Sequence, residues 1–154
     1  MSPLQVRRLF PAATLDAVQK AVAEGEKCHR GQMRFVVEAE LTTTQLWAGV
    51  TSRQRALDVF SLIRVWDTAE NNGVLVYVLL ADRKVEIVAD RGIHGEVGDE
   101  RWRAICREIE LRYRKGDFLN GSVIGVEKIS AELAHSFPAR DGGKNEQPDA
   151  PVIM

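Results

Sequence analysis

The chain has 154 residues and a mass of 17.2 kDa, which is the length of a single domain, and 45% of its residues are hydrophobic. Its 21 Lys and Arg residues are nearly balanced by 22 Asp and Glu residues, which argues against a strongly basic nucleic-acid-binding protein and against an acidic disordered chain. The longest apolar run, residues 74–81, is too short for a membrane helix, and residues 1–10 lack the apolar core of a signal peptide. The sequence therefore predicts a cytoplasmic protein with no membrane span, in which Cys28 and Cys106 are reduced.

The first predicted elements are a helix and a strand. Thr14 can cap a helix over residues 14–28, in which Leu15, Val18 and Val22 form an apolar stripe. Residues 33–41 then alternate between apolar and polar side chains, which predicts a half-exposed strand.

The middle of the chain predicts a helix followed by two paired strands. The helix spans residues 52–66, and the apolar residues 74–81 do not alternate, which is typical of a central strand covered on both faces. Only Asp82 and Arg83 separate that strand from a strand over residues 84–89, so the two must form an antiparallel hairpin.

Two more helices complete the predicted fold. They span residues 99–115 and 121–136, after a glycine-punctuated loop at residues 90–95. This order of elements predicts an α/β fold, a three-layer α/β/α sandwich with a small mixed sheet, a β-hairpin and helices on both faces.

The ends of the chain differ from its centre in composition. We expect residues 1–9 to form an N-terminal extension and residues 10–138 to form the domain. Residues 139–154 are rich in Gly, Pro and polar side chains, and we expect them to form a disordered tail.

Familiar catalytic patterns are weak or missing. Cys28 and Arg34 have the C-x5-R spacing of cysteine phosphatases, but this segment leaves a helix and enters a strand, the reverse of the order that surrounds a phosphate with amides. The Cys and His residues lack zinc-ligand spacing, and no P-loop or dinucleotide-binding motif occurs, so we expect no nucleotide or organic cofactor. The basic residues of the 99–115 helix indicate a solvated face more than a surface for an anionic partner.

Polar side chains gather in the loops that flank the predicted strands, where function concentrates on a rigid sheet. They are Glu26, His29, Asp67, Asn71, Asn72, Asp90 and Arg91, together with Glu38 and Glu40 on the first strand itself. Each residue type also has an ordinary role as a turn former or helix cap, so the residue types alone do not define a site.

Residues 65–93 resemble the centre of the TPM domain. The resemblance rests on the Asn-Gly-Val-Leu start of a strand at residues 72–75, on the hairpin, and on the glycine-containing loop after it. Residues 28–35 and Trp102 extend the similarity, which covers residues 10–138. The chain resembles in particular the short, stand-alone bacterial TPM proteins, and it is similar to the TPM domains of thylakoid acid phosphatases.

The resemblance implies an α/β/α sandwich and, from plant relatives described as calcium-binding acid phosphatases, a divalent cation such as Ca²⁺ or Mg²⁺. Our first hypothesis is a non-catalytic binding or scaffolding module for protein partners, tuned by a cation. The oxygen ligands suited to that cation are Asp67, Asn71, Asn72 and Asp90.

Our second hypothesis is a metal-assisted acid phosphatase. In it Arg91 neutralises the phosphate, and Glu26, His29 or Asp90 moves protons. The sequence shows no nucleophile, and we favour the first hypothesis.

Overall fold

A four-stranded mixed sheet with the order β3-β2-β1-β4 organises the computed structural model, which describes residues 1–140 and 145–154. β1 (Gln32–Glu38) is parallel to both β2 (Gly73–Leu79) and β4 (Val152–Ile153). β3 (Lys84–Ala89) is antiparallel to β2, and the short turn η1 (Leu80–Asp82) joins the two, so the predicted hairpin is confirmed.

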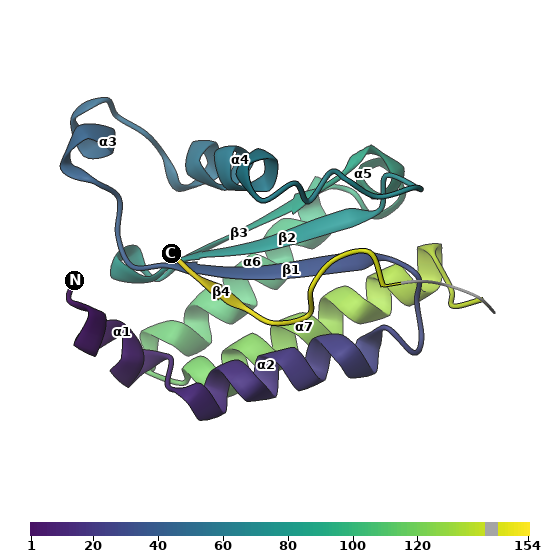
Figure 1. Ribbon diagram of the computed structural model, residues 1–154, viewed down its shortest axis with the longest axis horizontal. Coiled ribbons are helices and arrows are strands. Elements are labelled where there is room, and N and C mark those ends of the chain that lie inside the picture. The colour runs from purple at the N-terminus through teal and green to yellow at the C-terminus, as the bar shows by residue number, and fades with distance from the viewer. Residues whose placement is uncertain (141–144) are drawn as a thin grey trace.

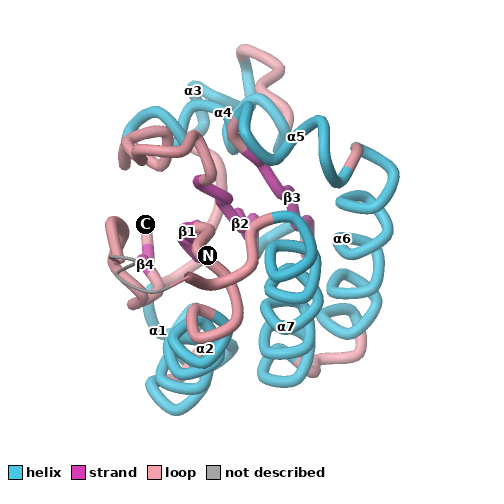
Figure 2. The backbone as a smooth tube through the Cα atoms, turned by 90° about the vertical axis from the view of Figure 1, so that its right-hand side faces the viewer, coloured by secondary structure: helices cyan, strands magenta, loops and turns pink. Residues whose placement is uncertain are grey.

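Helices lie on both faces of the sheet, as the predicted three-layer sandwich requires (Figures 1 and 2). The three long helices of one layer are α2 (Ala12–Gly25), α6 (Asp99–Arg114) and α7 (Phe118–Ser136). α4 (Ser52–Leu62) covers the opposite face. The short helices are α1 (Pro3–Leu9), α3 (Thr43–Trp47) and α5 (Arg91–Val97).

Two hydrophobic clusters hold the layers together. The larger lies between the sheet and the long helices and contains Phe35, Ile129 and Leu133. The smaller lies between the sheet and α4 and contains Val59 and Leu75. All seven residues of β2 are buried, because alternate side chains enter the two clusters, which confirms the predicted central strand.

The strand β1 is buried on both faces, whereas its alternating pattern predicts a half-exposed strand. Its outward-facing polar residues Arg34 and Glu38 are 9% and 8% exposed. Glu38 is covered because it pairs with Arg55 of α4, and Arg34 is covered because it donates a hydrogen bond to Gln147 of the C-terminal segment.

Both ends of the chain depart from the sequence-based expectation. The predicted extension over residues 1–9 contains α1, whose Val6 is buried in the larger cluster. The predicted disordered tail is ordered over residues 145–154, which lie along β1 and end in β4 (Figure 1), while residues 141–144 lie outside the described residues. The segment is held because the main-chain amides of Glu146 and Gln147 donate hydrogen bonds to Oε1 of Gln32 at 2.8 and 3.1 Å.

Across the residues that the structure describes, we find no helix that is both long enough and apolar enough to cross a membrane.

Candidate functional site

The predicted polar loops meet at one end of the sheet, where β1 and β2 begin and β3 ends. The register pairs Gln32 with Gly73 and Val74 with Ala89, so residues 26–31, 67–72 and 90–92 leave the sheet at this end, which we call the loop end. In Figure 1 it lies on the right, where α5 and the last turns of α2 and α7 are found.

Main-chain hydrogen bonds join these loops. The amide of Asp90 donates to the carbonyl oxygen of Gly73 at 2.9 Å, and the amide of Gly92 donates to that of Asn71 at 2.8 Å. The amide of Gln32 donates to the carbonyl oxygen of Asn72 at 3.0 Å. The starts of β1, β2 and α5 are therefore fixed relative to one another.

Asn72 is fully buried at the start of β2. Its Nδ2 donates to the carbonyl oxygen of Arg30 at 2.9 Å, and its main-chain amide donates to Oγ1 of Thr68 at 3.1 Å. Its Oδ1 is buried with no hydrogen-bond partner among the described residues. The amide side chain thus offers one unsatisfied oxygen ligand.

Asp90 is 9% exposed and caps α5, so the predicted glycine-punctuated loop over residues 90–95 is in fact the start of a helix. Its Oδ1 accepts a hydrogen bond at 2.7 Å from the amide of Arg91, the first residue of the helix. Its Oδ2 is buried and has no partner within the described part of the chain. The side chain of Arg91 is exposed.

The other two candidate cation ligands lie apart from these oxygens. Asp67 is exposed and forms an ion pair with Arg64 at 3.1 Å. Asn71 has an exposed side chain and a φ of 52°, so it serves as the turn former that its Asn-Asn-Gly context predicts. Asn72 and Asp90 are therefore the candidate ligands that the structure places at the adjoining ends of β2 and β3.

A divalent cation at the loop end would need oxygen ligands of several kinds. Among the described residues, no three His, Cys, Asp or Glu side chains converge as a metal site. Two buried oxygens without partners, Oδ1 of Asn72 and Oδ2 of Asp90, nevertheless have the hard-ligand chemistry that Ca²⁺ and Mg²⁺ prefer. Each of these two oxygens suits such a cation in kind. The alternation of side chains along the strands places Asn72 on the face of Val74 and Asp90 on the face of Val88.

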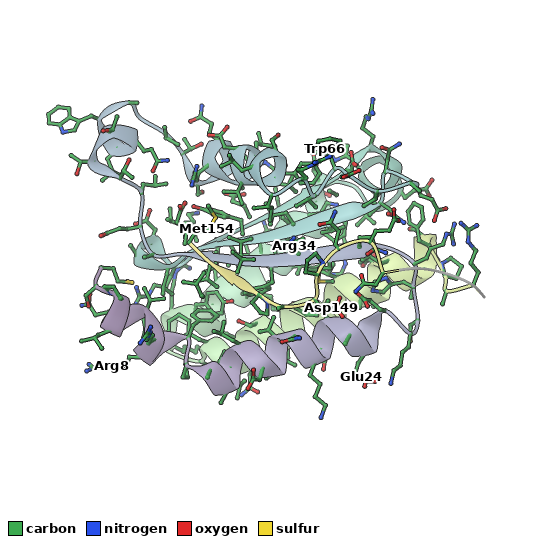
Figure 3. All side chains as sticks on the ribbon, viewed as in Figure 1. Arg8, Glu24, Arg34, Trp66, Asp149 and Met154 are labelled. Carbon is green, nitrogen blue, oxygen red and sulfur yellow. The ribbon has the colours of Figure 1, made fainter. Side chains whose placement is uncertain are left out.

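Glu26 follows α2 and faces Asp149 of the C-terminal segment, which Figure 3 shows between that segment and α2. Burial, and then the neighbouring Asp149 carboxylate, raise the pKa of Glu26 to about 8. Sequence reasoning missed Asp149 because it lies more than 120 positions from Glu26 in a segment expected to be disordered.

This acid pair makes a testable prediction about pH. Because the pKa of Glu26 is raised in the folded chain, its contribution to stability is complete below about pH 4.5 and is lost as the pH rises through about 8. Glu26→Gln should remove this loss and be more stable than the wild type by about 1 kcal/mol at about pH 9, since solvent screens a partly exposed pair.

The measurement is urea denaturation at about pH 6 and about pH 9. Glu24→Gln is the matched control, because Glu24 is exposed and pairs with Lys27. A wild type and a Glu26→Gln variant with the same pH dependence would contradict the prediction.

His29 and Cys106 are both buried, and burial shifts the pKa of each. His29 is 3% exposed, and burial lowers its pKa to about 4, so the imidazole is neutral at pH 7. Burial raises the pKa of Cys106 to about 12, which leaves it a thiol. Arg34 of the C-x5-R pattern donates to Gln147 at 3.4 Å, so it belongs to the packing of the C-terminal segment.

Comparison with known proteins relates the chain to one family. The TPM domain matches residues 6–132. The NMR structure of BA42, a protein of the psychrophilic bacterium Bizionia argentinensis, has a TM-score of 0.81 at 30% sequence identity and covers 93% of this chain and 94% of that chain. The solution NMR structure of the N-terminal domain of a P. gingivalis protein has a TM-score of 0.68 at 18% identity, covers 84% of this chain and 79% of that chain, and shows the fold alone. No curated protein matches the chain.

Proposed function

The chain belongs to the TPM domain family, and we propose that it is a non-catalytic binding module for protein partners, whose loop end is held in shape by Ca²⁺ or Mg²⁺. The observation that carries this proposal is the pair of buried, unpartnered oxygens on Asn72 and Asp90.

The free-energy cost of burying these oxygens without hydrogen-bond partners supports a bound cation. A buried acceptor left without a partner costs about 1–3 kcal/mol, and more when it is charged. Asp90 would hold the cation, and the positive charge of the cation would satisfy its buried carboxylate oxygen. The bound cation would then hold the start of α5, which main-chain hydrogen bonds already join to the start of β2, and so fix the loops that a partner would contact.

The arrangement of the acid–base candidates favours binding over catalysis. In the described parts of the chain, no hydrogen bond or ion pair joins Glu26 or His29 to Asp90 or Arg91. A phosphatase would need such a group beside the arginine to move protons. The phosphatase hypothesis therefore has less support, because it requires a proton-transferring group beside Arg91.

The test is a titration of the protein with CaCl₂ and with MgCl₂, followed by backbone amide NMR shifts and reversed with chelator. We expect saturable shifts at residues 67–73 and 90–95, together with a stabilisation of ~2.7 kcal/mol at a hundredfold excess over the dissociation constant. Asp90→Asn should abolish both effects while preserving α5, because Asn is as good an N-cap as Asp.

Asp67→Asn is the matched control, because it removes the same charge from an exposed carboxylate of the neighbouring loop. Flat amide shifts at millimolar cation would contradict the cation-tuned module. Phosphate release that disappears in both Asp90→Ala and Arg91→Ala would instead establish the phosphatase.

A further inference from the structure

The end of the sheet opposite the loop end gathers three segments that are distant in sequence. The hairpin turn, the end of α1 and the turn between α6 and α7 meet around Phe118. The guanidinium of Arg83 lies 5.7 Å from the centre of the Phe118 ring, and the ring of Phe10 lies 5.4 Å from it. We call this the basic end; it lies on the left of Figure 1.

Positive charge is concentrated there. Seven Lys and Arg residues but two Asp residues lie in the segments that form this end, residues 1–9, 80–84 and 111–119. In the whole chain the charges are balanced, with 21 Lys and Arg against 22 Asp and Glu. Among the described residues, five of these cations are exposed and have no ion-pair partner. They are Arg7, Arg8, Lys84, Arg114 and Lys115. Figure 3 shows Arg8 on the outer side of α1.

An apolar projection lies at the same end. Residues 42–51 carry no charge and include α3, which Figure 1 shows standing away from the sheet. Trp47 and Leu46 of α3 are 87% and 62% exposed, and no residue of α3 is buried. The N-terminal amino group forms an ion pair with Glu40, which holds the start of this projection beside α1.

The stability of the fold does not require an exposed Trp side chain at position 47. A capping box between Thr42 and Gln45 forms the helical turn from its own residues, with hydrogen bonds of 2.8 and 3.1 Å. The turn therefore presents Leu46 and Trp47 to the outside in a defined shape without contributing them to either core cluster. On α1, Leu4 is also 76% exposed.

We propose that the basic end docks reversibly on an anionic lipid bilayer, with Leu46 and Trp47 entering the interface. Exposed Lys and Arg residues are attracted to anionic lipids, and Trp prefers the boundary between headgroups and acyl chains. A nucleic acid would use the cations but has no apolar layer for Leu46, and an apolar protein surface would leave the cations unused. The bilayer interface accommodates both features of this end.

The docked orientation leaves the loop end facing away from the bilayer, because the two ends lie at opposite ends of the strands (Figure 1). The proposal does not depend on the cation or on the partner proposed above. It concerns an attachment at the surface, in a chain with no membrane-spanning helix among its described residues.

The test is co-sedimentation with vesicles of about seven parts phosphatidylcholine to three parts phosphatidylglycerol, and with pure phosphatidylcholine vesicles. We expect binding to the anionic vesicles only, weakened by high salt. Removing two cations in Arg114→Gln/Lys115→Gln should weaken binding about 30-fold, and Trp47→Ser should weaken it by at least about tenfold. Lys20→Gln/Lys27→Gln, which removes one exposed charge from α2 and one from the turn after it, is the matched control and should bind as the wild type does.

Two further measurements make the outcome decisive. Trp fluorescence should shift to the blue on binding, and Trp47→Phe should lose most of that shift while keeping most of the affinity. Anionic-vesicle binding that Trp47→Ser leaves unchanged, or no binding at low salt, would overturn the proposal. Tighter binding to a DNA or RNA duplex than to the vesicles would overturn it in favour of a nucleic-acid surface. Unchanged melting temperatures show that the variants are folded.

Discussion

Glu38→Ala should lower the free energy of unfolding by about 3–5 kcal/mol, because it breaks a buried ion pair by removing one partner. Both oxygens of Glu38 accept hydrogen bonds from Arg55, at 2.8 and 2.9 Å, and the hydroxyl of Tyr77 donates to Oε1 at 2.5 Å. The substitution would leave the partly buried Arg55 guanidinium and the buried Tyr77 hydroxyl without their acceptor. Urea denaturation measures the change.

Two comparison variants isolate the ion pair. Glu96→Ala should change stability by less than about 0.5 kcal/mol, because Glu96 is exposed and has no ion-pair partner among the described residues. Glu38→Leu/Arg55→Leu should recover much of the loss, since apolar side chains can replace a buried pair at little cost. A loss below about 1 kcal/mol in Glu38→Ala would show that the pair is not buried.

The same carboxylate sets a pH dependence opposite in sign to that of Glu26. Burial alone would raise the pKa of Glu38, but hydrogen bonds from Arg55 and Tyr77 outweigh it and lower the pKa below its ordinary value of 4.5. Its contribution to stability is therefore complete above about pH 4.5 and is lost as the pH falls through the lowered value. Glu38→Ala should accordingly flatten the acid limb of the stability curve.

The sequence predicts the parts of the fold that depend on neighbouring residues. The hairpin follows from the short connection between its strands, and the buried β2 follows from an apolar run without alternation. The environment of β1 was not predictable in this way, because its covering residues come from elsewhere. Glu38 is paired with a residue of α4, and Arg34 with Gln147, which lies 113 positions away.

The candidate site was also only partly predictable from neighbouring residues. Asn72 and Asp90 could be selected because polar residues flanking strands are common at functional sites. Which of the four oxygen residues turn inward depends on backbone geometry: Asn71 takes a left-handed φ and faces solvent, while its neighbour Asn72 is fully buried. The partner of Glu26 lies in the C-terminal segment, whose Gly, Pro and polar composition indicates disorder. No local pattern shows that the amides of Glu146 and Gln147 match the side chain of Gln32.

Gly73→Ala should destabilise the protein by about 3 kcal/mol or more and lower its melting temperature by roughly 6–12 °C. A Cβ at Gly73 would lie 2.1 Å from the carbonyl oxygen of Val65, and a main-chain atom cannot turn away as the end of a side chain can. Gly73 is the first residue of β2, where the lack of a side chain lets the chain at Val65 pass close to the strand.

Gly95→Ala is the matched control for Gly73→Ala, because nothing lies within 4 Å of a Cβ at Gly95 in α5. It should leave stability unchanged or raise it by about 0.4–1 kcal/mol, since alanine reduces the freedom of the unfolded chain. Calorimetry measures both variants, and amide shifts in Gly73→Ala should spread to Asp90, whose amide donates to the carbonyl oxygen of Gly73. A Gly73→Ala variant as stable as Gly95→Ala would mean that the approach of Val65 to β2 does not fix the loop end, and Asn72 and Asp90 would then have no common support.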